Sequence, residues 1–259
     1  MSRRLLTIVL TVLLLVVLAL ELSGAVPGIG VQTLPLLILL LAAVLVWRAV
    51  WPERASGAAQ ALAIPRGEHD HAALDVTFGA GELRLEPGHD PAVLLGGDLE
   101  GGAQPVVMQS AARVSIQLKQ PFSLLRRRAV WRLAYAPGVS WSQMRWRLGA
   151  AQAHLDLRAA EVHTCQIEAV GTTLAVWLPA SGTVTLEVSG GHTTITVPRD
   201  APVTVESVIR LGEVTLPEAG FEADESGMRW TARGAVPDAE GLAITLKGGL
   251  GTVTLRWAE

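Results

Sequence analysis

The sequence predicts a two-helix membrane hairpin followed by an all-β domain that resembles a single-stack β-solenoid, with rungs of about 19–22 residues. Three observations support this fold class. Residues 165–217 contain an internal repeat, residues 1–54 contain two long apolar stretches, and residues 73–259 show almost no helical periodicity. We therefore expect three parts: a membrane hairpin at 1–54, a linker at 55–72 and a β domain at 73–259.

The repeat is seen when the sequence is shifted by 19 residues. The aligned columns keep their chemistry: Cys165, Val184, Val203; Ile167, Leu186, Val205; Glu168, Glu187, Glu206; Val176, Ile195, Val214; Leu178, Val197, Leu216; Pro179, Pro198, Pro217. A shift of 21 extends the match upstream, where Met144, Trp146 and Leu157 align with Cys165, Ile167 and Leu178. A period near 20 with alternating β-branched residues and Gly or Pro corners indicates stacked β rungs. An antiparallel sandwich is the alternative, because regular turn spacing also marks that fold.

Looser copies of the repeat flank this region. One begins at Leu74, and another begins at Ala243 and ends in Trp257. We expect the last copy to cap the stack. The acidic run at 221–240 interrupts the rungs and is expected to form a polar excursion.

The apolar stretches at residues 5–20 and 31–50 have the character of membrane helices. A spanning helix needs about 20 apolar residues, with about 17 as the lower limit, so the second stretch fits and the first is slightly short. A secretory signal is the alternative for the first stretch. Arg3, Arg4, Arg48 and Arg54 flank the stretches, whereas residues 21–33 lack Lys and Arg. The positive-inside rule therefore predicts a multi-pass protein of the bacterial cytoplasmic membrane with both termini and the β domain in the cytoplasm.

Charge is unevenly distributed along the chain. Residues 101–155 hold eight basic residues and no acid, while residues 156–259 hold fourteen acids and seven basic residues. The basic block predicts an anionic neighbour, either anionic lipid or a partner, unless the acidic segments of the chain neutralise it. The candidate membrane- or partner-binding residues are Lys119, Phe122, Leu124, Leu125, Arg126, Arg127, Arg128 and Arg132. Nucleic acid is disfavoured, because the pI is about 6.1 and no nucleic-acid motif accompanies the basic block.

The sequence contains no catalytic, cofactor-binding or metal-binding signature. Neither a G-x-S-x-G, an H-E-x-x-H nor a Walker loop is present, so no enzyme activity or cofactor is expected. The neighbouring Ser189 and His192 lack an orienting acid in the sequence pattern. The remaining candidate is an outward ladder of charged residues, spaced about 4.8 Å apart on successive rungs. Its members are Arg147, Glu168, Glu187 and Glu206. We interpret it as a solvated face, with a cation or carbohydrate site as the alternative.

The β region resembles the C-terminal domain of LiaF-type cell-wall-active-antibiotic response proteins, also called toast-rack proteins. The resemblance covers residue 74 to about residue 221 and includes a G-A-G strand pair, an L-D-L rung and rungs that end in Pro. It implies a bacterial membrane protein, and characterised members restrain a sensor histidine kinase in envelope-stress signalling. This chain departs from those members in having two apolar stretches where they commonly have more.

The sequence thus predicts a non-enzymatic membrane protein whose β domain binds a protein partner or the membrane surface, in envelope-stress sensing or in regulation of a sensor kinase. Two alternatives stay open: a membrane-tethered polymerising scaffold that resembles bactofilins, and a carbohydrate-binding or carbohydrate-active β-helix.

Overall fold

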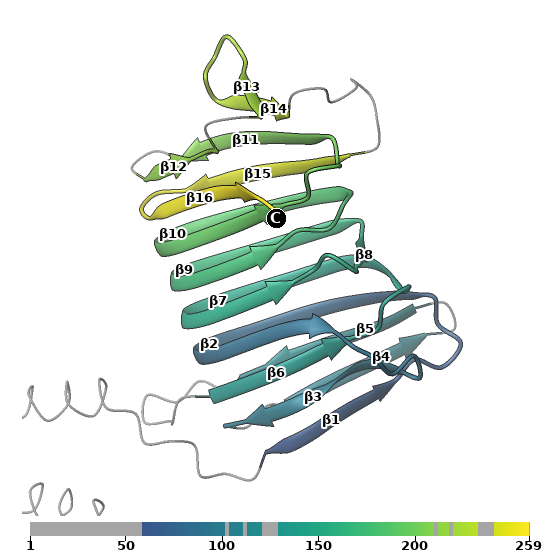
Figure 1. Cartoon of the computed structure of the whole chain (residues 1–259). Coiled ribbons are helices and arrows are strands. Elements are labelled where there is room, and N and C mark those ends of the chain that lie inside the picture. Colours follow the sequence, from purple (N-terminus) through teal and green to yellow (C-terminus); the bar gives the residue numbers. More distant parts are fainter. Residues whose placement is uncertain are drawn as a thin grey trace, which may run out of the picture. The chain divides into compact units, whose positions relative to one another are not determined.

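The computed structural model describes residues 59–101, 104–110, 113–120, 129–209, 212–217, 220–232 and 241–258. All regular structure in these segments is β-strand, which confirms the predicted all-β domain (Figure 1). Within the same segments, no helix has the length and apolar character needed to span a bilayer. The predicted membrane hairpin at 1–54 lies outside the described residues. The strands are β1 (Gln60–Pro65), β2 (His71–Pro87), β3 (Val93–Glu100), β4 (Gln104–Ser110), β5 (Arg113–Lys119), β6 (Ala129–Tyr135), β7 (Ser140–Asp156), β8 (Glu161–Val162), β9 (Thr164–Trp177), β10 (Gly182–Val197), β11 (Val203–Ile209), β12 (Glu213–Thr215), β13 (Phe221–Ala223), β14 (Arg229–Ala232), β15 (Leu242–Gly248) and β16 (Thr252–Trp257).

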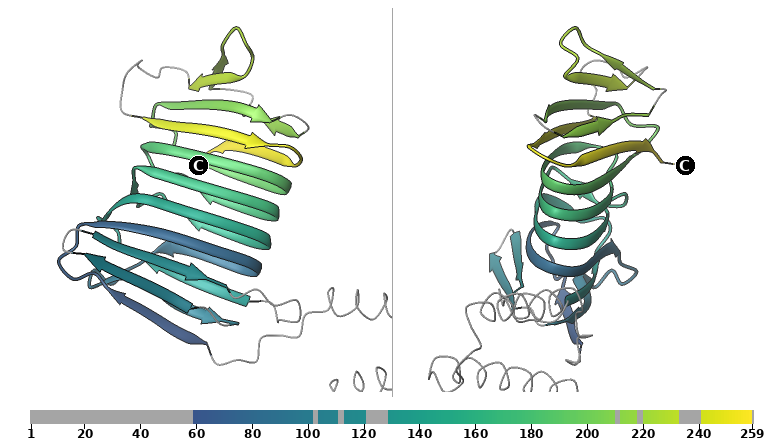
Figure 2. Two further views of the ribbon diagram at one scale, coloured as in Figure 1. Left: turned by 180° about the vertical axis from the view of Figure 1, so that it is seen from behind. Right: turned by 90° about the vertical axis from the view of Figure 1, so that its left-hand side faces the viewer.

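Four long strands form the centre of the domain, and each bends once along its length. β2, β7, β9 and β10 lie side by side in parallel in that order. We call the part of each rung before the bend the first arm and the part after it the second arm. Figure 2, right, looks onto the stacked bends. The sequence shifts of 21 and 19 residues equal the pairing register of these strands, because Met144 lies opposite Cys165 and Cys165 lies opposite Val184.

Glycine permits the rungs to bend close to one another. Gly190 and Gly191 have φ values of 88° and 93°, so this pair forms the bend of one rung. A Cβ at Gly191 would lie 2.2 Å from the carbonyl oxygen of Thr172. A Cβ at Gly149 would likewise lie 2.2 Å from the carbonyl oxygen of Gly79. The bends of adjacent rungs therefore approach through backbone atoms alone.

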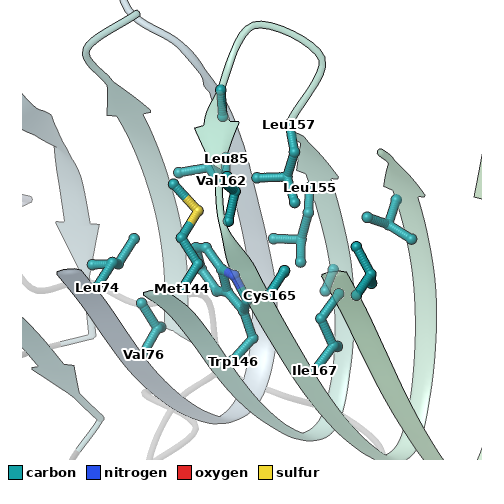
Figure 3. Packing of buried hydrophobic residues seen from close by; sticks show 14 of the residues in the cluster. Leu74, Val76, Leu85, Met144, Trp146, Leu155, Leu157, Val162, Cys165 and Ile167 are labelled. Atoms are coloured by element: carbon teal, nitrogen blue, oxygen red, sulfur yellow. The ribbon is translucent and has the colours of Figure 1, made fainter. Parts of the chain in front are cut away.

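The hydrophobic core lies between the two arms. Alternate residues of each strand face inward, as expected for a pleated strand with one buried face. In Figure 3, Met144 and Cys165 of the first arm lie between the arms together with Leu85 and Leu155 of the second arm. All four side chains are fully buried. Burial of each apolar side chain of this size stabilises the fold by about 1.5–3 kcal/mol.

The last two strands are inserted within the stack. β15 pairs with the first arm of β10 on one side and with β11 on the other. β16 pairs with the second arm of β10 and with β12. Figure 1 shows these yellow strands between the green β10 and β11. The prediction that the last copy of the repeat caps the stack is therefore wrong.

This insertion also changes the columns of the repeat beyond β10. Val184 lies opposite Ile244, which in turn lies opposite Val205, so Val205 and not Val203 continues the Val184 column. In the second arm, Val214 lies opposite Val253 and belongs to the row of Thr193, two residues away from the predicted Ile195 row.

Different strands close the two ends of the stack. β5 and β6 together form one rung beside β2, on the first and second arm respectively. β3 and β4 form the next rung in the reverse direction, and β1 pairs with β3. The predicted linker at 55–72 is therefore partly wrong, because it contains β1 and the start of β2. At the other end, β14 pairs with β11 and β13 pairs with β14. The first part of the predicted polar excursion at 221–240 therefore forms two strands of the sheet.

Candidate functional site

Residues of the first arm line a groove near the start of the stack, and all of them except the buried, inward-facing Leu74 have outward side chains. The groove has a volume of about 310 Å³, and its residues come from the adjacent strands β5, β2 and β7. They are Ala73, Leu74, Asp75, Ser115, Gln117, Gln143 and Arg145. Asp75 lies opposite Gln117 on one side and opposite Arg145 on the other. The parallel register thus places an amide, a carboxylate and a guanidinium group in one row.

A β-bulge shapes one side of the groove. Ala72 lies opposite Trp141, but Ala73 lies opposite Gln143, so Ser142 is an extra residue in β7. Its hydroxyl donates a hydrogen bond of 3.0 Å to the carbonyl oxygen of Ala72. A bulge bends its strand and re-aims the side chains next to it. Gln143, which follows the bulge directly, lines the groove with Ala73.

Two arginines of β7 connect the groove to carboxylates on both neighbouring rungs. Arg147 Nη1 lies 3.5 Å from Asp75 Oδ1, and Arg147 Nε lies 3.9 Å from Glu168 Oε2. Arg145 Nε donates a hydrogen bond of 3.0 Å to Gln166 Oε1 and lies 4.0 Å from Glu168 Oε1. The charged side chains in these pairs are 30% to 44% exposed, so each pair contributes at most about 1 kcal/mol to stability. Their main effect is to orient the two guanidinium groups along the outer face.

The outward ladder differs from the predicted one at its last member. Arg147, Glu168 and Glu187 occupy successive rungs as predicted. The next member of this row is Lys247, because β15 lies between β10 and β11. Glu206 lies opposite Thr245, in a different row. The ladder therefore has two carboxylates between two cations, and the row of three carboxylates that suggested a cation site does not form.

The candidate basic residues are divided between the arms. Lys119 lies at the end of β5 on the first arm, opposite Thr77, whereas Arg132 lies on the second arm between Asp98 and Arg84. Residues 120–128 connect these arms, and all but the first of them lie outside the described residues. These comprise the predicted contact residues Phe122, Leu124, Leu125, Arg126, Arg127 and Arg128. The structure therefore does not bring Lys119 and Arg132 onto one arm.

A second polar cluster lies where β7 ends on the second arm. Arg158 donates two hydrogen bonds to Asp156, from Nε to Oδ1 at 3.0 Å and from Nη2 to Oδ2 at 2.6 Å. The hydrogen bonds from Arg158 hold the pKa of Asp156 below its usual value. The centre of the Trp177 ring lies 5.8 Å from Arg158 Cζ and 4.3 Å from the centre of the His154 ring. Burial and the nearby Arg84 lower the pKa of His154. We interpret this cluster as a clamp that holds the ends of β7 and β9 together.

The groove residues were not found from the sequence. Asp75 and Arg145 are 70 positions apart, and the described residues between them include the strands β3, β4, β5 and β6. One signal was present: the repeat copy that begins at Leu74, aligned with the rung at Met144, places Asp75 in the column of Arg145. Ser115 and Gln117 had no such signal, because β5 is a single arm with no matching copy.

Comparison with known proteins shows the fold. No family model matches the chain, and its sequence matches no curated protein significantly. The crystal structure of a candidate cell adhesion protein from Clostridium sporogenes is similar, with a TM-score of 0.70 and 13% identity. That match covers 80% of this chain and 100% of the other. A candidate adhesin from Bacteroides fragilis matches with a TM-score of 0.30 and 10% identity over 79% of this chain and 100% of the other. At 13% identity the first likeness establishes a shared β-rich fold.

Proposed function

We propose that the β domain is a non-enzymatic recognition domain that binds a protein partner through the groove and the charged residues beside it. The observation that carries this proposal is the mixture of groups on one outward surface. Asp75, Gln117 and Arg145 lie in one row, and the neighbouring β4 exposes Val106 and Met108, which are 49% and 51% exposed. Val106 lies opposite Gln117, so the apolar side chains border the polar groove.

This mixture suits a protein more than a small cofactor. Interfaces between proteins are enriched in Met and Arg and combine an apolar patch with polar groups. The groove volume of about 310 Å³ is at the lower limit for small-molecule pockets. A groove of this size can accept one or two side chains of a partner while the outer face around it contacts the rest.

The biological setting follows from resemblance. We propose that the chain is anchored in the bacterial cytoplasmic membrane by residues 1–54 and that the partner is a membrane protein such as a sensor histidine kinase. The LiaF-type resemblance supports this setting, and the likeness to a candidate cell adhesion protein supports a binding role in general. The polar groups of the groove also suit a sugar, so carbohydrate is the competing ligand.

Site-specific photo-crosslinking in the native bacterium tests the proposal. A photoreactive residue at the exposed Gln117 of the full chain should capture a discrete protein, whereas the same residue at Thr194, outward on the second arm, should not. Arg145→Glu should reduce capture at Gln117, because it reverses the charge at the opposite side of the groove. Equal adducts at both positions, or adducts that Arg145→Glu leaves unchanged, would argue against a groove-bound partner. Adducts removed by glycan-degrading enzymes would support carbohydrate instead.

A further inference from the structure

The strand β4 has an open edge at the first-arm end of the stack. In the described part of the chain, β4 pairs only with β5, whereas β1 covers the neighbouring β3 on the second arm. Val107 lies opposite the fully buried Ile116, so it belongs to the inward row, yet it is 38% exposed. The side chain is exposed because no described strand lies beyond β4. An unpaired edge presents N–H and C=O groups that can pair with another strand.

We propose that β4 pairs antiparallel with β4 of a second copy of this chain, about a twofold axis at Val107. The strand has seven residues, QPVVMQS, and Val107 is its centre. In this pairing Val107 meets Val107 of the other copy, and Val106 meets Met108. A twofold interface must be self-complementary. β4 satisfies this condition, because it contains no charged residue that would face its own copy.

The partner of β4 is the same strand of a second copy, which gives a closed dimer. A head-to-tail contact, which would give a filament, is disfavoured. Native edge strands are commonly protected by charged side chains or by Pro. β4 lacks charged side chains but contains Pro105, which has no backbone N–H to donate to a second copy. The opposite end of the first arm ends in β13, an edge strand of three residues that is joined to β14 by an acidic segment including Asp224 and Glu225. A head-to-tail contact would place β4 against this short edge, and short edge strands disfavour pairing. The same-end contact instead closes after two copies.

Pairing would also place two grooves on one assembly. Val106 and Met108 lie opposite Gln117 and Ser115, which line the groove, so the paired β4 strands would form the border between two grooves. Two linked sites can bind a paired partner with higher avidity than one site. The pairing itself does not depend on the ligand of the groove.

The contact is small, so it requires a trapping assay. A standard stable interface buries about 1,600 Å² in total, and a pair of seven-residue strands buries less. Cysteine crosslinking of the full chain in membranes isolated from its host cells, with copper phenanthroline added as the oxidant, records such weak pairing. Val107→Cys should give a disulfide-linked dimer, because directly opposite residues meet the distance that a disulfide needs. Val208→Cys, 48% exposed at the other end, is the matched control and should stay monomeric. The native Cys165 is buried and should not react.

Charge placement on β4 then tests the register. In the Val107→Cys background, adding Val106→Lys and Met108→Lys should lower the dimer yield about fivefold or more, since like charges would be directly opposite. Val106→Lys with Met108→Glu should restore it, because each new lysine would face a new glutamate. The four substituted sites, Val106, Val107, Met108 and Val208, are partly exposed. Unchanged melting temperatures confirm that the variants fold. Equal crosslinking of Val107→Cys and Val208→Cys, no dimer from either, or a yield unaffected by the two lysines would overturn the proposal.

Discussion

Adjacent residues on one rung differ sharply in their environment, since one faces the core and the next faces solvent. Leu186 is 1% exposed, whereas Glu187 is exposed on the outer face. We expect Leu186→Asp to lower the free energy of unfolding by about 3–5 kcal/mol, because an unpaired charge would be buried. Glu187→Lys should change it by less than about 1 kcal/mol. Thermal melts of the two purified variants measure this contrast, and equal effects would indicate a register shifted by one residue.

The bends of the rungs depend on particular glycines. Gly191→Ala should destabilise the fold by about 2 kcal/mol or more, because the new Cβ would meet Thr172 at 2.2 Å and φ is +93°. Gly171 is the matched control: its φ is +60°, and a Cβ there would have nothing within 4 Å. Because Asn tolerates this left-handed conformation, Gly171→Asn should cost less than about 1 kcal/mol. Chemical denaturation of both variants tests the contrast, and a larger loss for Gly171→Asn would contradict the described bends.

The clamp at the end of β7 should give the domain a specific dependence on pH. Hydrogen bonds from Arg158 lower the pKa of Asp156 in the folded state, so their stabilisation is present above the unfolded pKa of about 3.9 and is lost as pH falls through the folded value. Asp156→Asn should therefore cost about 1–2 kcal/mol at pH 7. The difference between the wild type and the variant should shrink below about pH 4. Denaturant titrations at several pH values measure it, and a difference that stays constant with pH would refute the clamp.

At the scale of elements, the sequence predicted the rungs well and their neighbours less well. Residues 144–197 form consecutive parallel strands, and their period equals their register because each rung follows the previous one directly. The place of β15 and β16 could not be read in this way. Alternation in residues 242–257 suits any inward row of the stack, so it identifies the segment as a rung without saying which strands it contacts. The same ambiguity led to the prediction that Glu206 continues the ladder. The groove was not predicted, because it joins strands that are distant in sequence.

The insertion of the last strands predicts how a shortened chain should behave. Deletion of residues 241–259 removes the strands that lie between β10 and β11, so that β10 keeps only β9 and β11 keeps only β14 as a partner. We therefore expect residues 203–232 to become protease-sensitive, while the rungs from β2 to β10 stay protected. Limited proteolysis followed by mass spectrometry measures this. Continued protection of residues 203–216 in the shortened chain would mean that β11 pairs directly with β10.

At the scale of the whole domain, the outer face of the first arm is a continuous surface assembled from segments far apart in sequence. It extends from Asp75 and Arg145 in the groove to the ladder residues Glu187 and Lys247. The core between the arms holds these strands in fixed register, so the charged side chains are presented at regular spacing. The proposed recognition function depends on this arrangement. Two arginines of the basic block at 101–155 are neutralised within the domain, because Arg145 and Arg147 lie close to carboxylates on neighbouring rungs.

Disulfide trapping across the ladder tests this arrangement most directly. Glu187 and Lys247 lie opposite each other on adjacent parallel strands, so Glu187→Cys with Lys247→Cys should form a disulfide readily under mild oxidation. Glu187→Cys with Glu206→Cys should not, because β15 lies between their strands and places them about 9–10 Å apart or more. Burial raises the pKa of Cys165 to about 12, so this thiol should not interfere. Intramolecular crosslinking is measured by mass spectrometry of the oxidised chain. A disulfide in the second pair but not in the first would contradict the inserted strand and the outer face built on it.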